Sequence, residues 1–410
     1  MMEEQAKFTV IVPTRERPDT LVHCLRTLVM QDYDNLTILV SDNFSGDETR
    51  DVVESFNDGR IRYVNTGKRV SMSHNWEFAL NHVDRGWVTF LGDDDGLLPG
   101  AISLLNDIIT EFPCEAINSS RCTYFWPNSG TANGAILAVP TKKEKAEYLR
   151  SRTVLAAVMV GQALYTDLPF LYQSGLATIA TINRARDANG VFFMSRMPDV
   201  YSGIALSSVC EKFLRIGTPF ALAGSSRHSN AAPATNLNNQ TAPWDKYVSE
   251  ENIPFHRNLV FGKAFRLLTY ECYLQSQFLH HDILTLNLRD QLELAIADNG
   301  TEPRHVIREQ CEQIAARNGI KFSNTSLSGF KRLVKVSIRR QYRRLANVPG
   351  RKLLLGEDAA GRNVFEASLK ASEVISLADS SIAFTNSLQN IVAELRPRSV
   401  ARRLKLIRYA

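Results

Sequence analysis

The sequence lacks the segments that would export the chain or anchor it in a bilayer. It begins Met-Met-Glu-Glu-Gln, without the basic start and long apolar core of a signal peptide. The longest apolar stretch lies around residues 153–164 and is too short to span a membrane. We therefore expect a cytoplasmic protein, either free in solution or peripheral at the inner face of the membrane.

Metal and nucleotide motifs that can be recognised by their spacing are also missing. No two of the six cysteines form a CxxC pair, so we expect buried reduced thiols rather than a zinc ribbon or a disulfide framework. There is no Walker loop, GxGxxG, GxSxG or HExxH, and no internal repeat. The enzyme classes that those motifs define therefore receive no support.

What is present is an ordinary globular composition with unevenly distributed charge. The 410 residues are 44% hydrophobic, 22% charged and 9% aromatic, which excludes disordered and collagen-like chains. The net charge of +5 is the sum of two different regions. Residues 331–410 hold 17 Lys and Arg against six Asp and Glu, a net +11, so the remainder carries −6. An acidic body with a basic C-terminal segment needs an explanation.

The first 112 residues alternate between short apolar runs and amphipathic stretches. We expect helices between and after four strands, which lie at 8–13, 36–41, 61–64 and 87–91. Ser45 to Glu48 has the pattern of a capping box, and Pro99 suits the first turn of a helix reaching Ile109. This order predicts an α/β fold with a mainly parallel, Rossmann-type sheet flanked by helices. Ligands of such sheets bind beyond the C-terminal strand ends, at 13–17, 42–45 and 92–96.

The pattern after residue 112 is mixed. Residues 225–243 are rich in Asn, Ala, Ser and Pro, which predicts a loop. Beyond Pro254 the apolar residues return with helical spacing. We expect helical structure from there to the C-terminus.

Three adjacent carboxylates form the sharpest local signal, in Leu91-Gly-Asp-Asp-Asp-Gly96. Such a cluster repels itself unless a cation or solvent relieves the charge. Oxygen ligands at a strand end suit Mg²⁺ or Mn²⁺ bound to a diphosphate. On these residues alone, a solvated acidic turn before a helix is the simpler interpretation.

Four motifs that follow one another along the chain favour the metal site over the solvated turn, because together they resemble the inverting family-2 glycosyltransferases. They are VIVPTRERP (10–18), VSDNFSGDE (40–48), SMSHNWEFAL (71–80) and FLGDDDGLLPGA (90–101). Enzymes of that family have a GT-A fold and transfer sugars from nucleotide-diphosphate donors. The resemblance implies a metal-dependent, hexosyltransferase-type reaction that passes a sugar to a hydroxyl acceptor, in cell-surface polysaccharide or glycolipid synthesis. It covers about residues 7–110 and fades by about 230.

The resemblance also implies an organisation of the chain. We expect a GT-A-like catalytic domain over 1–250, with a nucleotide-binding half at about 7–112 and an acceptor-binding half at about 113–250. A helical region over 251–330 and a basic helical segment over 331–410 would follow.

The family's donor-binding residues can be carried over to matching positions. Asp42 matches the carboxylate that reads the base and would accept an N–H from uracil, which favours a UDP-sugar. Asp93 and Asp95 match the outer positions of the DxD motif; we expect Asp95 to bind Mn²⁺ or Mg²⁺ and Asp93 to reach the ribose or a metal-bound water. We expect Arg15 or Arg17 to face the base or the phosphates, with a surface arginine as an equal alternative for either. The remaining expected donor-binding residues are Pro13, Thr14, Arg15, Glu16, Asn43, Asn75 and Asp94.

An inverting transfer also needs a general base, which the family places well downstream of DxD. Asp199, in Met-Pro-Asp-Val-Tyr-Ser-Gly, is the best candidate, and a helix N-cap is a compatible role. His228 lies where several GT-A enzymes return a histidine to the metal, with a surface histidine as the alternative. Arg227 could hold the diphosphate, and the polar loop at 229–240 is a candidate lid.

The basic segment has two interpretations. Residues 330–345 place apolar side chains on one helical stripe between Arg and Lys, as in helices that bind anionic membranes. A solvated face that packs on the acidic body or on a second subunit fits equally, and a homo-oligomer is left open. A membrane position would suit a lipid-linked acceptor; a free saccharide is the other option. No RNA- or DNA-binding module is present, so no nucleic-acid partner is expected.

Two other functions remain as alternatives. A nucleotidyltransferase of similar fold would also use metal-bound carboxylates, but residues 12–16 lack the glycine-rich loop usual in that class. A non-catalytic, membrane-associated scaffold would not require Asp93, Asp95 and Asp199.

Overall fold

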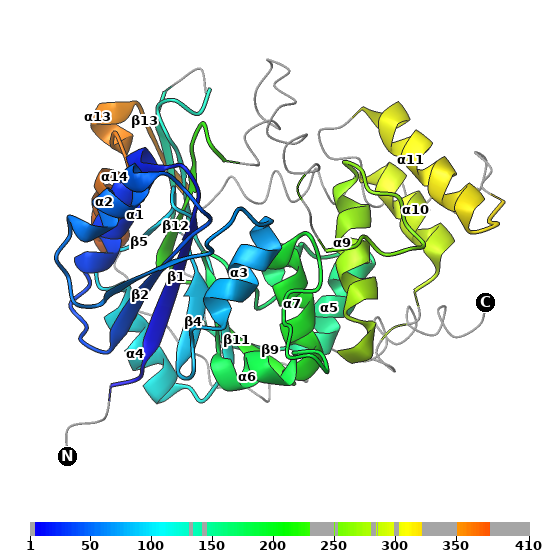
Figure 1. Ribbon diagram of the computed structural model, residues 1–410, viewed down its shortest axis with the longest axis horizontal. Coiled ribbons are helices and arrows are strands. Elements are labelled where there is room, and N and C mark those ends of the chain that lie inside the picture. The colour runs from blue at the N-terminus through cyan, green and yellow to red at the C-terminus, as the bar shows by residue number, and fades with distance from the viewer. Residues whose placement is uncertain are drawn as a thin grey trace.

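The computed structural model describes residues 5–130, 134–141, 146–229, 250, 253–279, 284, 286–298, 303–321 and 351–377. Within these ranges the chain forms an eight-stranded and a five-stranded sheet, with helices on both faces of the larger one (Figure 1). The larger sheet has the order β3-β2-β1-β4-β10-β6-β11-β9. The expectation of an α/β fold with a large sheet flanked by helices is confirmed.

The N-terminal strands pair in parallel and end at one edge. They are β1 (Phe8–Thr14), β2 (Leu36–Asp42), β3 (Ile61–Asn65) and β4 (Trp87–Phe90). The register sets Thr14 beside Asp42 and Asp42 beside Asn65, so the expected ligand loops begin side by side. The helices that connect and follow these strands are α1 (Pro18–Val29), α2 (Asp47–Glu54), α3 (Met72–Leu80) and α4 (Ala101–Glu111). The alternation expected for this half is therefore correct.

Two local expectations for these helices are wrong. Helix α2 has Gly46 as its N-cap and no side-chain cap, because the Ser45 hydroxyl donates to the buried Asp42 carboxylate instead (2.5 Å). Helix α4 begins at Ala101, after Gly100 in the left-handed region (φ 70°), so Pro99 precedes the helix.

The second half makes the sheet mixed rather than parallel. Strand β10 (Gly175–Thr178) runs antiparallel to both β4 and β6 (Ala116–Ser119). Strand β11 (Lys212–Ile216) is parallel to β6 and antiparallel to β9 (Glu147–Arg150). The smaller sheet is β13-β8-β7-β12-β5. Its members are Arg351–Leu355 (β13), Ile136–Pro140 (β8), Cys122–Phe125 (β7), Ala221–Ser225 (β12) and Gly96–Leu97 (β5).

The helices of the second half are α5 (Ser151–Met159), η1 (Tyr165–Asp167), α6 (Ile179–Arg184), α7 (Pro198–Val209), α9 (Phe265–Gln275), η3 (Gln277–Leu279), α10 (Leu288–Ala297) and α11 (Arg304–Arg317). They lie beside the large sheet and extend away from it, because α7 contacts α9, α9 contacts α10 and α10 contacts α11 (Figure 1). One apolar core contains residues of β4, α7, α9, α10 and α11. The helical expectation after Pro254 is confirmed by α9, α10 and α11.

The described part of the basic segment joins the body. Residues 351–355 form strand β13 on the edge of β8, not the expected helix, because that edge offers backbone partners in register. After α13 (Glu357–Ala360), helix α14 (Val364–Leu377) buries Val364, Ala367 and Ala371 in a core with β7 and β8. The basic stripe at 330–345 lies outside the described residues. No helix in the described ranges is both long and apolar enough to cross a membrane.

Candidate active site

The acidic loop lies between β4 and β5, at the C-terminal edge of the parallel strands. Asp93, Asp94 and Asp95 are only 2%, 5% and 0% exposed. A solvated acidic turn is therefore excluded, and each carboxylate must be balanced by neighbours.

Asp93 is paired with residues of the first strand-end loop. The Thr14 hydroxyl donates to its Oδ2 (2.8 Å) and the Arg17 guanidinium to its Oδ1 (3.2 Å). Arg17 also donates to the His228 carbonyl oxygen (2.6 Å). Burial raises the pKa of Asp93, with the Arg17 cation opposing this shift. Arg17 thus faces the site and not solvent.

Asp94 is held by the turn that follows β12. Its Oδ2 accepts hydrogen bonds from the Ser226 hydroxyl (2.8 Å), the Ser226 N–H (3.2 Å) and the Ser229 hydroxyl. The Trp126 indole donates to the Asp94 carbonyl oxygen (3.1 Å). Two serine hydroxyls are partners that can rotate away, so Asp94 can accept a new ligand at small cost.

Asp95 is turned into the protein. The N–H groups of Gly92 (2.8 Å) and Gly224 (2.6 Å) donate to its two oxygens, and Gln173 Nε2 lies 3.0 and 3.1 Å from them. Burial and the neighbouring Asp94 raise the pKa of Asp95 to about 7. This enclosure disagrees with the expectation that Asp95 is the principal metal ligand, because its lone pairs already have protein donors.

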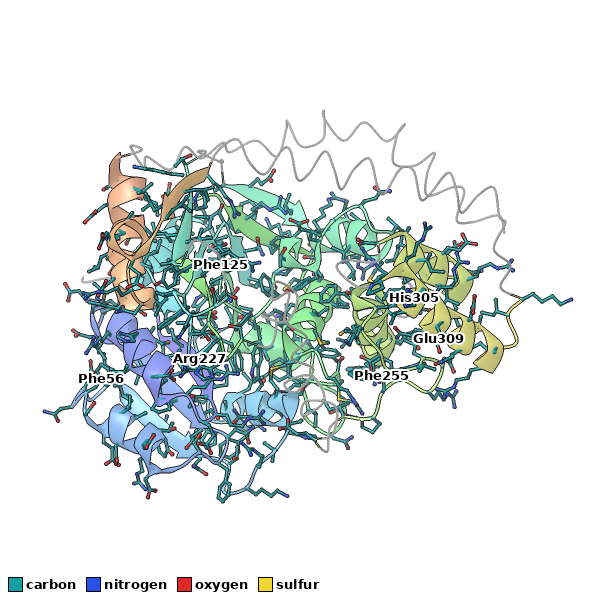
Figure 2. All side chains as sticks on the ribbon, turned by 90° about the horizontal axis from the view of Figure 1, so that it is seen from above. Phe56, Phe125, Arg227, Phe255, His305 and Glu309 are labelled. Carbon is teal, nitrogen blue, oxygen red and sulfur yellow. The ribbon has the colours of Figure 1, made fainter. Side chains whose placement is uncertain are left out.

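His228 is also directed elsewhere. Its Nε2 lies 3.2 Å from Asp19 Oδ2 and accepts from Arg227 Nε (3.0 Å). Arg227 pairs with Asp19 too (3.1 Å), and in Figure 2 it lies over the N-terminal helices, drawn in blue. The expected metal set of Asp93, Asp95 and His228 is not assembled, and no group of three His, Cys, Asp or Glu suited to a metal occurs among the described residues.

Asp93 and Asp94 are the carboxylates best suited to a metal. They are adjacent, buried and made of hard oxygen donors. Mg²⁺ commonly takes one or two carboxylates and completes its shell with water and substrate phosphates. This pair therefore fits a divalent cation that arrives with a diphosphate.

Asp42, the expected base-reading residue, has four protein donors. They are the Ser45 N–H (3.0 Å) and hydroxyl, the Tyr63 hydroxyl (2.6 Å) and the Asn65 amide (3.0 Å). Reading a base here would require one of the exposed partners, such as Asn65, to move.

The two expected asparagines brace the scaffold. Asn43 exchanges hydrogen bonds with the Val70 backbone (2.7 and 2.9 Å), and Asn75 does so with Ser41 (2.8 and 3.3 Å). They fix the loop before α3, and α3 itself, to β2.

The rest of the first loop lines the same edge. Pro13 is half-buried, Arg15 pairs with Glu250, and Glu16 is exposed with a left-handed backbone (φ 55°). The Glu16 N–H donates to the Ser45 hydroxyl (2.8 Å), which joins the loops after β1 and β2. The candidate lid at 229–240 lies outside the described residues except for Ser229.

Asp199 lies in the first turn of α7 and is partly exposed. The N-cap of this helix is Met197, without a side-chain bond, so the N-cap alternative for Asp199 is wrong. Burial raises the pKa of Asp199, while a hydrogen bond from the Tyr165 hydroxyl and the nearby Arg121 cation act against the shift. The Asp199 side chain is thus partly accessible to solvent and more basic than that of an ordinary aspartate.

Sequence reasoning missed a group of residues between Asp95 and Asp199. Arg121 donates to Gln173 Oε1 (3.2 Å), which directs the Gln173 amide nitrogen at Asp95. Gln173 has a left-handed backbone (φ 55°) in a turn so tight that a Cβ on Gly175 would lie 1.9 Å from the Phe170 carbonyl oxygen. The Gln-Ser-Gly triplet signals a turn but not its partners.

Comparison with known proteins finds matches to the N-terminal half of the chain. The sequence model of glycosyl transferase family 2 matches residues 9–161. A β-1,3-glucosyltransferase of Campylobacter jejuni subsp. jejuni serotype O:2, named for GalNAc(5)-diNAcBac-PP-undecaprenol, is 39% identical over 102 residues. These are 24% of this chain and 33% of that protein. The glycosyltransferase GlyA of Streptococcus pneumoniae serotype 4 is 29% identical over 27% of this chain and 16% of its own length. The chain thus spans a third or less of these curated relatives.

Two solved structures align over more of the chain. S. aureus TarS 1–349 in complex with UDP-GlcNAc has a TM-score of 0.45 and 13% identity, covering 79% of this chain and 95% of that one. The mannosyltransferase PcManGT of Pyrobaculum calidifontis, in complex with GDP-Man and Mn²⁺, has a TM-score of 0.37 and 14% identity, covering 92% and 89%. The likeness to glycosyl transferase family 2 thus extends over residues 9–161 of this chain.

Proposed function

We propose that the chain is an inverting, metal-assisted glycosyltransferase that moves a sugar from a nucleotide-diphosphate donor to a hydroxyl acceptor. The observation that supports this most is that the buried Asp93 and Asp94 lie together with the half-buried Arg17, inside the region that matches family 2. Carboxylates for a cation and a guanidinium for phosphate oxygens lie together at the strand ends, where such sheets bind ligands.

The donor would lie across the ends of β1, β2 and β4. Arg17 is a suitable partner for the diphosphate because its guanidinium matches phosphate geometry. Asp42 would receive the base, and its acceptor chemistry favours uracil. Asp93 and Asp94 would hold Mn²⁺ or Mg²⁺, which supplies charge compensation for the departing diphosphate.

Asp95 would then be a positioning residue and not a metal ligand. Its bonds to Gly92, Gly224 and Gln173 join the acidic loop to β12 and to the turn before β10. Holding Asp93 and Asp94 at fixed positions lowers the cost of organising the site during the reaction.

Asp199 would be the general base. It takes the proton of the acceptor hydroxyl as the acceptor oxygen bonds to the anomeric carbon and the bond to the diphosphate oxygen breaks. Its pKa is raised by burial, which strengthens it as a base near neutral pH.

For the acceptor we propose a chemical class, and for the protein we propose a position at the membrane. The Campylobacter relative is named for a polyprenyl-diphosphate-linked saccharide, so we propose an acceptor of that lipid-linked kind, in cell-surface polysaccharide or glycolipid synthesis. The basic residues of 331–410 would hold the protein at an anionic membrane, each contributing about 1 kcal/mol near the surface.

Donor turnover tests the proposal. A panel of UDP- and GDP-sugars with Mn²⁺ or Mg²⁺ is assayed for release of the nucleoside diphosphate. Asp94→Asn and Asp199→Asn should each lose most of the activity, whereas the exposed control Asp51→Asn should retain it. Full activity in both site variants would refute the assignment.

A further inference from the structure

One tyrosine hydroxyl lies between the acidic loop and the candidate base. Burial and then the nearby carboxylates of Asp95, Asp94 and Asp199 raise the pKa of Tyr172. The residue before it, Leu171, donates its N–H to the Ser202 hydroxyl (2.9 Å), which donates to the Asp199 carbonyl oxygen (2.7 Å). A Cβ placed on Gly92 would lie 2.8 Å from the Tyr172 hydroxyl oxygen. The hydroxyl therefore lies against the loop that carries Asp93 and Asp94, on the side of Asp199.

The Tyr172 ring is held in place by buried aromatic residues. Its centroid lies 5.5 Å from that of Trp76, which stacks on Phe90 at 4.4 Å with 10° between the planes. Phe193 packs edge-on against both of these rings, at 5.6 Å each. The next residue, Gln173, is anchored through its N–H to the Phe90 carbonyl oxygen (2.8 Å). A hydroxyl on so rigid a support suits a group that must be positioned before a substrate binds.

The geometry of an inverting displacement predicts which part of the substrate lies beside the Tyr172 hydroxyl. The acceptor oxygen attacks from the side of the anomeric carbon opposite the leaving diphosphate. The sugar must therefore lie between the acidic loop, which holds the diphosphate, and Asp199, which receives the proton. A phenol oxygen keeps its lone pairs for another donor when its own proton points to a neighbouring carboxylate.

We infer that Tyr172 is a substrate-contacting residue whose hydroxyl oxygen accepts a hydrogen bond from the donor sugar. The inference rests on the proposed function and adds a contact to the sugar, not to the nucleotide. It makes Tyr172 a determinant of which sugars are accepted, because a donor without the matching hydroxyl leaves the Tyr172 oxygen without that partner.

Tyr172→Phe tests the contact with the least change in shape. Binding of UDP and of the UDP-sugar that the wild type binds best is measured by calorimetry with Mn²⁺. We expect the Kd for UDP to stay within about twofold and the Kd for the UDP-sugar to rise about tenfold, as for one hydrogen bond. The matched control is Tyr33→Phe, which should change neither value, because its hydroxyl donates to the Ala6 carbonyl oxygen (2.6 Å) just before β1, at the opposite end of that strand.

Every other outcome would refute either the sugar contact of Tyr172 or the proposed glycosyltransferase function. If UDP and the UDP-sugar weaken equally, Tyr172 only supports the acidic loop; if neither weakens, there is no sugar contact. Deoxy donors give a second test with the wild-type protein: one of them should bind about tenfold more weakly and be insensitive to Tyr172→Phe. If no deoxy donor behaves so, the inference fails. Wild-type protein that binds no nucleotide-sugar would refute the proposed function instead.

Discussion

The contact between β12 and the acidic loop can be tested at one glycine. A Cβ on Gly224 would lie 1.8 Å from the Asp94 carbonyl oxygen and 2.7 Å from its carbon, so Gly224→Ala must move one backbone away from the other. That movement would stretch the bond from the Gly224 N–H to Asp95 (2.6 Å). The variant should therefore lose both packing and the placement of Asp93 and Asp94.

The size of the effect follows from these two losses. Overpacking costs about 1–3 kcal/mol, and a hydrogen bond to a charged group contributes about 1.5–3 kcal/mol. We expect the free energy of unfolding to fall by about 3–5 kcal/mol at neutral pH, measured by urea denaturation. The Kd for UDP with Mn²⁺ should rise at least tenfold in calorimetry at a temperature where the variant is folded.

A second glycine provides the control. A Cβ added at Gly59 would meet no heavy atom within 4 Å, and the backbone there is not left-handed. Gly59→Ala should therefore leave stability equal or up to about 1 kcal/mol higher. UDP affinity in Gly59→Ala should be unchanged. If Gly224→Ala matched Gly59→Ala in both measurements, the close approach of β12 would not organise the acidic loop.

The remaining predictions concern charge. Arg17→Met should weaken UDP at least tenfold in calorimetry but leave uridine binding unchanged, because the guanidinium serves the diphosphate; equal losses would contradict this. Asp94→Asn should raise the Mn²⁺ concentration needed for half-maximal UDP binding more than Asp95→Asn does. Asp95→Asn should instead lower the free energy of unfolding by about 1–3 kcal/mol, because it leaves hydrogen-bond donors unsatisfied. A larger rise in the Mn²⁺ concentration for Asp95→Asn than for Asp94→Asn would favour Asp95 as the metal ligand. Burial raises the pKa of Glu271, so the folded state holds its proton more tightly than the unfolded state and stability falls as pH rises above 4.5. The free energy of unfolding of Glu271→Gln should therefore increase relative to that of the wild type as the pH rises above 4.5, measured by urea denaturation; a difference that does not change with pH would contradict the shift.

The fold of residues 7–112 was predictable because its signals are local. Apolar runs such as 8–13 mark strands buried on both faces, and the parallel order then brings Thr14, Asp42 and the acidic loop to one edge. Strand β13 was not predictable in this way. Residues 351–355 are a strand because β8 offers them an edge, and that partner lies more than 200 residues earlier in the chain.

The three adjacent carboxylates show the same limit at the scale of single atoms. In the sequence Asp93, Asp94 and Asp95 differ only in order, and an alignment to a DxD pattern favours the outer two. In the fold their partners come from different elements: Arg17 from the first loop, serines from the turn after β12, and backbone N–H groups with Gln173 for the last. Rotatable hydroxyls can yield to a cation, whereas backbone N–H groups cannot leave without moving a strand. We therefore expect the role of each carboxylate to depend on how readily its partners can move, which only the tertiary structure supplies.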